Sequence, residues 1–309
     1  MSESTSAAVN GLSPDEIKFI QDAAEYLENP SFLIRLAEMF GKPVEWLIQG
    51  IEKVSPEIVD KAANASLRAA LSVAISTIPE SRSINIDEST RLADIGSSPD
   101  FWHKVSVAVT GTAGGFFGLL GLCVELPFTT TIMFRSIASI AHEFGERLDD
   151  EEVRMQCLAV LSFGGPGKEC EAMESTYLTA RVALEAMISA AAKAVAGKTA
   201  EEIATMVQKG TAAAVVNLIA RIAARFDVIV TEKVVVESLP VIGAVTGATI
   251  NIAFMDHFNR VARFHFGMRK LERKYGVDRV QSLYRDAVRQ ERERGSIRVL
   301  TAADRVPGL

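Results

Sequence analysis

The stretch GTAGGFFGLLGLCVELPFTTTIMF, residues 111–134, decides how the rest of the chain is interpreted, because it is apolar and glycine-rich in an otherwise charged sequence. It overlaps an uncharged run of 20 residues, 105–124. As a helix, this run would span about 30 Å, the thickness of a bilayer core. Three interpretations are open: a membrane span, a helical hairpin that touches lipid, and the buried centre of a soluble bundle.

The insertion free energy of this region is close to zero. Nine Val, Phe and Leu residues in the run contribute about -3 to -5 kcal/mol in total on the insertion scale. A second helix, expected to begin at Pro127, would bury Arg135 at a cost of about 2.5 to 3.5 kcal/mol, and Glu125 lies at the junction. The sequence therefore does not specify a stable double span. Glu125 and Arg135 instead suggest an ion pair, or a polar site at the end of an apolar groove.

The glycines of this region are spaced for close helix packing. Each costs a water-exposed helix roughly 1 kcal/mol relative to alanine, so a neighbouring backbone or an acyl chain is expected to compensate. Two GxxxG pairs occur here, and a second apolar run, 238–255, contains another. A phosphate-binding loop is excluded because no Gly-Lys-Ser/Thr follows the glycines. The candidate contacts with lipid or a lipid-like ligand are Gly111, Gly114, Gly115, Gly118, Glu125, Pro127, Arg135, Gly243, Gly247 and Asn251.

The composition favours an all-α protein, a multi-helix bundle with glycine-rich apolar helical hairpins in its centre. Hydrophobic residues make up 48% of the 309 residues and aromatic ones only 7%, which suits close-packed helices. The net charge of -6 argues against nucleic acid as a partner. The three cysteines show no CxxC spacing, and the first residues do not resemble a secretory signal. We therefore expect a protein of the reducing cytosol.

Several helix ends can be predicted from capping residues. Ser13 and Glu16 have the spacing of a capping box around Pro14, and Thr199 with Glu202 repeats it. Asp149 is expected to cap a helix in the same way. Four glycines are expected to end helices: Gly145, Gly197, Gly210 and Gly276.

The pattern of apolar residues and turn residues predicts twelve helices and five segments. The helices are expected near 14–28, 31–39, 43–52, 55–78, 99–124, 127–144, 150–163, 169–196, 200–225, 227–237, 241–275 and 277–293. The β-branched stretch VIVTEKVVV, 228–236, leaves one of these assignments doubtful. The segments are a disordered N-terminus (1–13), an N-terminal helical arm (14–78), a polar linker or loop (79–99), a helical core (100–293) and a C-terminal tail (294–309).

A basic amphipathic helix follows the second apolar run. Its apolar residues recur at helical spacing: Val261, Phe264, Met268, Leu271 and Tyr275. Glu272 is the single acidic residue among the basic ones. In an acidic protein such a cluster suggests a patch for anionic lipid head groups, although a solvated helix that packs on the core has the same pattern. The candidate patch consists of Arg260, Arg263, Arg269, Lys270, Arg273 and Lys274.

The sequence contains no catalytic or metal-binding motif that we can identify. The four histidines, at 103, 142, 257 and 265, lack metal-ligand spacing. Asp256-His257 and His142-Glu143 are neighbours along a helix and point about 100° apart, so neither pair forms a general-base site by itself. We expect neither a cofactor nor a metal.

Several motifs resemble the EcsC family of bacterial proteins over roughly residues 14 to 288. They are VELPFTT (124–130), RSIASIAHEFG (135–145), LPVIGA (239–244), RFHF (263–266), GKPVEW (41–46) and RKYGV (273–277). By this resemblance Glu125 takes the acidic position of an acidic-Leu-Pro-x-x-Thr pattern, followed by Leu126, Pro127 and Thr130. The family is named for association with an exporter-type ABC transporter, which implies a cytoplasmic or membrane-associated protein without an established activity.

The expected function is that of a non-enzymatic protein whose glycine-rich hairpins pack together and contact or enter the cytoplasmic leaflet of the inner membrane, guided by the basic helix. Its partners would be anionic lipid and a membrane protein complex, and the oligomeric state stays open. One alternative is a soluble bundle that binds a lipid-like ligand in an apolar cavity, with Glu125 and Arg135 at its polar end. A weaker alternative is a hydrolase acting on a hydrophobic substrate.

Overall fold

The computed structural model describes residues 11–28, 56–76, 118–163, 175–237 and 247–294. Within these ranges every regular element is helical, which confirms the predicted fold class. The α-helices are α1 (Pro14–Glu28), α4 (Pro56–Ser76), α7 (Gly118–Glu143), α8 (Glu151–Ala159), α9 (Thr176–Val195), α10 (Ala200–Gln208), α11 (Ala213–Glu237), α12 (Gly247–Tyr275) and α13 (Val277–Glu293). A short 3₁₀ helix, η3 (Val160–Ser162), follows α8.

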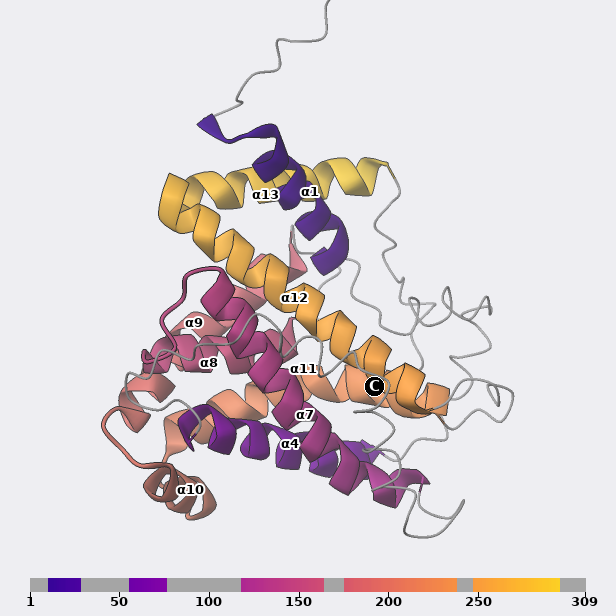
Figure 1. Cartoon of the computed structure of the whole chain (residues 1–309), viewed down its shortest axis with the longest axis vertical. Coiled ribbons are helices and arrows are strands. Elements are labelled where there is room, and N and C mark those ends of the chain that lie inside the picture. The colour runs from indigo at the N-terminus through magenta and orange to yellow at the C-terminus, as the bar shows by residue number, and fades with distance from the viewer. Residues whose placement is uncertain (1–10, 29–55, 77–117, 164–174, 238–246, 295–309) are drawn as a thin grey trace, which may run out of the picture.

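The long helix α12 organises the described bundle. Its 29 residues span about 43 Å, and it packs against α1, α7, α11 and α13. Figure 1 shows α12 running diagonally across the molecule, with α13 and α1 near its C-terminal end and α7 and α4 crossing farther down. α4 lies along α7 and α11. Helices α1 and α4, from the predicted N-terminal arm, thus contact helices of the predicted core. The boundaries predicted between the segments stay a prediction.

The helix ends agree closely with the capping residues. Ser13 and Glu16 exchange two hydrogen bonds, from Ser13 N to Glu16 Oε2 at 2.7 Å and from Glu16 N to Ser13 Oγ at 3.2 Å. A complete capping box also starts α10 at Thr199. The four glycines predicted to end helices all have positive φ, the conformation that favours glycine after a helix. One cap was assigned wrongly: Asp150, rather than Asp149, accepts the hydrogen bond that starts α8, because Asp149 pairs with Arg147.

The helix α7 continues through Pro127, so the helix boundary predicted there is wrong. A proline inside a helix removes one backbone hydrogen bond and costs about 3 kcal/mol. Extensive packing of α7 against α4 and α12 offsets this cost. In the following turn, Thr131 Oγ1 donates a hydrogen bond to the Pro127 carbonyl at 2.9 Å. The stretch from Gly118 to Glu143 is consequently one helix rather than the turn and second arm of a hairpin.

Tertiary packing also decides the region of α10 and α11. The break predicted near residue 226 is absent, and the chain turns instead at Gly210, between the two helices. The β-branched stretch 228–236 is helical, with Ile229, Val230 and Val234 buried in the core. Burial of these side chains outweighs their modest preference for strands.

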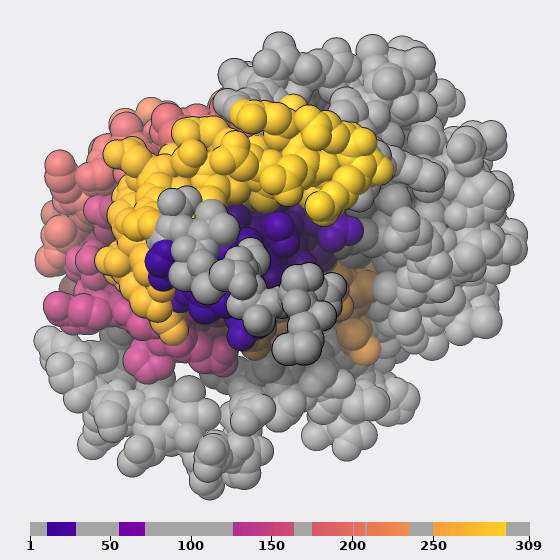
Figure 2. Space-filling view, turned by 90° about the horizontal axis from the view of Figure 1, so that it is seen from above, coloured from indigo at the N-terminus to yellow at the C-terminus, as the bar shows by residue number. Residues whose placement is uncertain are grey.

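The N-terminal helix α1 lies in the angle between α12 and α13, where the space-filling view shows it flanked by both (Figure 2). Its inner face buries Ile20, Ala23 and Leu27. Where α1 meets α12, the Phe19 ring occupies space that a side chain at Gly267 would need: a Cβ built there would lie 2.2 Å from Phe19 Cζ. Gly267 therefore allows the close approach of α1.

Candidate functional site

Most of the glycines predicted to contact lipid or a lipid-like ligand lie outside the residues that the structure describes. Gly111, Gly114, Gly115 and Gly243 lie outside the described residues. Gly118 is the first residue of α7 and Gly247 the first residue of α12. The predicted GxxxG packing therefore stays a prediction.

The structure does not bring Glu125 and Arg135 together. Both belong to the continuous helix α7, in which ten residues correspond to about 15 Å along the axis. Arg135 is exposed, Pro127 is half-buried, and Asn251 is buried in α12. A mutual ion pair of Glu125 and Arg135 is incompatible with this continuous helix. An ion pair of either residue with another neighbour, and a polar site at the end of an apolar groove, stay predictions.

The amphipathic character predicted for the basic helix is confirmed in α12. Val261, Met268 and Leu271 are buried in the core, while Phe264 and Tyr275 are partly buried and packed against it. The six basic residues of the predicted patch, however, occupy two different faces of the helix. At 100° per residue, Arg260, Arg263, Lys270 and Lys274 fall within an arc of about 80°, whereas Arg269 and Arg273 project from a different sector of the helix.

The first group forms an exposed row, which we call the cation stripe: Arg260, Arg263, Lys270 and Lys274. It extends about 21 Å along α12. Contacts with α1 border it on one side and contacts with the end of α7 on the other. Lys274 Nζ donates to Glu16 of α1 at 2.8 Å, and Arg263 Nη1 pairs with Glu143 of α7 at 3.2 Å. All four side chains are exposed to solvent.

The ion pairs of the cation stripe are weakly held. Arg260 Nε pairs with Asp256 at 2.9 Å, and both side chains are more than half exposed. Lys270 lies with its ammonium 6.0 Å from the Phe144 ring centroid. Exposed pairs contribute roughly 0 to 1 kcal/mol and weaken with salt. Arg260, Arg263 and Lys270 can therefore exchange their present partners for another anion at little cost, whereas Lys274 is held more firmly by Glu16, whose side chain is 22% exposed.

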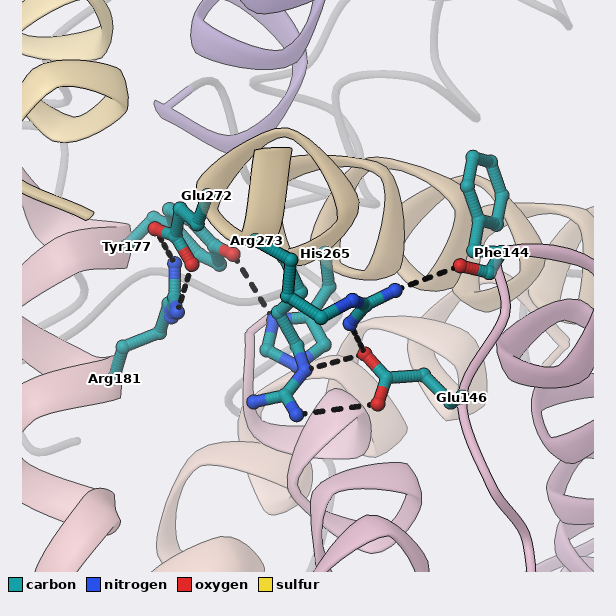
Figure 3. Close-up of polar contacts among 8 residues, drawn as sticks. Phe144, Glu146, Tyr177, Arg181, His265, Glu272 and Arg273 are labelled. Atoms are coloured by element: carbon teal, nitrogen blue, oxygen red, sulfur yellow. Dashed lines mark hydrogen bonds and ion pairs between the residues drawn. The ribbon is translucent and has the colours of Figure 1, made fainter. Parts of the chain in front are cut away.

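The second group of basic residues serves the fold. Arg269 Nε donates to Glu146 Oε1 at 2.8 Å, and Arg273 donates to the same carboxylate and to the Phe144 carbonyl (Figure 3). The Glu146 side chain is only 6% exposed. Burial by itself would raise the pKa of Glu146, yet the two guanidiniums hold that pKa below its ordinary value. Arg269 and Arg273 thus neutralise a buried charge, and we remove them from the predicted lipid patch.

A second buried pair joins α9 to α12. Arg181 donates two parallel hydrogen bonds to Glu272, at 2.8 and 2.9 Å (Figure 3). Close by, the Tyr177 hydroxyl lies 2.9 Å from Nδ1 of His265. Burial, with arginines nearby, keeps the pKa of His265 well below its ordinary value, so the imidazole is neutral. Among these groups, only Glu272 gave a signal in the sequence, as the lone acid in a basic cluster.

The C-terminal end of α1 carries a buried carboxylate that the sequence analysis missed. Glu28 accepts hydrogen bonds from Ser175 Oγ at 2.6 Å and from Thr176 N at 2.8 Å, at the start of α9. The Tyr284 hydroxyl of α13 donates to the same carboxylate at 3.1 Å. A carboxylate at a helix N-terminus satisfies backbone donors and interacts favourably with the helix dipole. Glu28 therefore joins three helices.

The described residues contain neither a metal cluster nor a spanning helix. Across these ranges, no three His, Cys, Asp and Glu side chains lie together so as to hold a metal ion. His257 and His265 are buried and face tyrosine hydroxyls, and His142 is exposed. Within the same part of the chain, no helix combines the length and the hydropathy needed to cross a bilayer.

The fold and its surfaces define an all-α helical-bundle protein built around one long amphipathic, cationic helix. The chain belongs to the EcsC protein family, whose family model matches residues 17–271. The family predicted from the sequence motifs is therefore confirmed. The match runs from α1 nearly to the end of α12, so α13 lies beyond it. No curated protein and no solved structure matches the chain.

Proposed function

We propose that this EcsC family protein is a non-enzymatic peripheral protein of the cytoplasmic leaflet that docks on anionic lipid through the cation stripe of α12. The single observation that carries the proposal is the alignment of four exposed cations along about 21 Å of one helix face. Each cation close to an anionic leaflet contributes about 1 kcal/mol. Four of them supply reversible attachment rather than permanent anchoring.

The weakness of the present ion pairs supports this proposal. Asp256 and Glu143 are exposed and lie at the edges of the stripe, so lipid phosphates can replace them without uncovering a buried charge. The buried pairs of Arg269 and Arg273 cannot be exchanged in the same way, because Glu146 would lose its partners. The docking surface therefore excludes these two residues.

An exposed aromatic residue on α7 supports contact with a membrane. Phe128 is 51% exposed and lies seven residues before Arg135. This spacing places both side chains on one face of α7, about 10 Å apart. An aromatic ring next to a cation is typical of surfaces that lie at a lipid–water interface. A membrane protein complex, such as a transporter, is a further partner that this surface can contact once the protein lies on the leaflet.

Flotation with vesicles tests the proposal. We expect the protein to float with vesicles of phosphatidylcholine and phosphatidylglycerol, to remain unbound with phosphatidylcholine alone, and to be released by salt. The triple variant Arg260→Gln, Arg263→Gln, Lys270→Gln removes three of the four charges, or about 3 kcal/mol of attraction. Its partition coefficient on anionic vesicles should fall about 100-fold.

A matched control uses three exposed lysines of α9 and α10 or their flanking loops. The variant Lys193→Gln, Lys198→Gln, Lys209→Gln changes the net charge equally and leaves α12 intact. It should float like the unmodified protein. Equal losses in the two triple variants would show that net charge, and not the stripe, governs binding, and absence of flotation at low salt would refute the proposal.

A further inference from the structure

A polar pocket opens between α8, α9, α12 and α13, away from the cation stripe. Its volume is about 240 Å³, room for several water molecules. The residues that line it are mostly charged or amide-bearing: Glu152, Gln156, Arg181, Val182, Glu185, Arg269, Glu272, Arg273, Val277 and Gln281. Four helices therefore direct hydrogen-bonding groups into one space.

The buried side of the pocket is lined by the amide of Gln156. Gln156 is only 7% exposed, and its amide makes no hydrogen bond with any residue that the structure describes. Its amide nitrogen and oxygen are not among the fully buried polar atoms without a partner, so they are open to the pocket. Its donors and its acceptor line the pocket, so a bound molecule can satisfy both.

The arginines of the pocket carry a local surplus of positive charge. Arg181 and Glu272 neutralise each other through their two parallel hydrogen bonds. Arg269 and Arg273, in contrast, share the single carboxylate of Glu146. The two guanidiniums therefore hold one positive charge and several N–H donors in excess, which suits a phosphate or a carboxylate.

Two carboxylates of the pocket are available for a cation. Glu152 and Glu185 are exposed residues of α8 and α9 and make no ion pair with another described residue. Two unusually exposed apolar side chains, Val182 at 65% and Val277 at 52%, lie beside these charged groups. The lining thus offers an anion site, a cation site and a small apolar rim.

We propose that this pocket binds a small zwitterion that carries a phosphate or carboxylate at one end and an ammonium group at the other. The anionic end contacts Arg269, Arg273 and the Gln156 amide, and the ammonium contacts Glu152 and Glu185. Methylene groups between the two ends pack against the rim of Val182 and Val277. The site is separate from the cation stripe, so it does not depend on membrane docking.

Calorimetric titration of the full chain with soluble probes tests this inference. We expect saturable binding of phosphoethanolamine, and binding at least tenfold weaker for inorganic phosphate or ethanolamine alone. Equal affinity for inorganic phosphate would reduce the site to a simple anion site and overturn the proposal. No binding of phosphoethanolamine or 4-aminobutyrate would overturn it as well. Glycerophosphoethanolamine distinguishes the sources: equal affinity indicates a lipid head group, and a large loss indicates a free small molecule.

Matched substitutions locate the binding. Glu185→Gln and Gln156→Leu should each weaken phosphoethanolamine binding about tenfold or more. Glu201→Gln, an exposed carboxylate of α10, should leave it unchanged, as should the triple variant of the cation stripe. Unchanged affinity in Glu185→Gln and Gln156→Leu refutes the site. Circular dichroism confirms that each variant is folded before titration.

Discussion

Replacing Glu28 with glutamine tests whether one buried carboxylate holds α1, α9 and α13 together. The carboxylate accepts hydrogen bonds from Ser175 Oγ, Thr176 N, Tyr177 N and the Tyr284 hydroxyl. Glutamine has the same shape, but its NH₂ group would face a backbone N–H or a hydroxyl that donates. The variant loses one charge-assisted bond, about 1.5 to 3 kcal/mol, and part of the charge–dipole attraction, up to about 2 kcal/mol. We expect the free energy of unfolding to fall by about 2 to 4 kcal/mol.

Thermal unfolding followed by circular dichroism measures this loss as a shift of about 1.5 °C per kcal/mol for a chain of this size. Glu25→Gln is the matched control, because Glu25 is exposed on the same helix and should change stability by less than about 0.5 kcal/mol. Tyr284→Phe removes one donor, and a double-mutant cycle with Glu28→Gln should give a coupling of about 0.5 to 3 kcal/mol. Equal melting temperatures of the Glu28→Gln and Glu25→Gln variants would refute the role of Glu28 in holding the three helices together.

Three further substitutions probe other contacts of α12. Gly267→Ala gains about 1 kcal/mol of helix propensity but must displace the Phe19 ring, at a cost of about 1 to 3 kcal/mol. A urea titration should therefore show no net gain in stability, and a stabilisation by the full ~1 kcal/mol contradicts the close approach. Hydrogen bonds from Lys274 and Ser13 N lower the pKa of Glu16 from 4.5 to about 2. The stabilisation that Glu16 contributes is therefore complete above pH 4.5 and is lost as the pH falls toward 2. In Glu16→Gln, the melting temperature should depend less on pH in this range than in the unmodified protein. The same pH dependence in both proteins would show that Glu16 does not contribute in this way. Glu146→Gln leaves two guanidiniums without their carboxylate and should cost about 3 kcal/mol; a loss no greater than that of an exposed Glu→Gln change, measured by thermal unfolding, argues against this role.

Local patterns predicted much of the fold because they depend on neighbouring residues. Short-range stereochemistry accounts for the capping box of Ser13 and Glu16 and for the four glycines that end helices. Helical periodicity accounts for the buried face of α12. The helix boundary predicted at Pro127 was wrong for the same reason. Its local effect is to break a helix, whereas packing of the whole of α7 decided the outcome.

The buried pairs were invisible in the sequence because their members are far apart along the chain. Arg181 and Glu272 are separated by 91 positions, and nothing near Arg181 marks it as different from any other helical arginine. The basic cluster of α12 illustrates the reverse situation. Its six cations look equivalent in sequence. In the structure, however, Arg269 and Arg273 pair with Glu146, whereas the other four lie at the surface.

The Glu28 contact also has a consequence for synthesis on the ribosome. Tyr284 is made 256 positions after Glu28, and at about 5 to 20 residues per second this delay lasts on the order of 10 to 50 s. For most of that interval α1 lacks α12 and α13, the later helices that it packs against, so Ile20 and Leu27 are without these partners. Completion of the native bundle therefore waits until the last helix has left the exit tunnel.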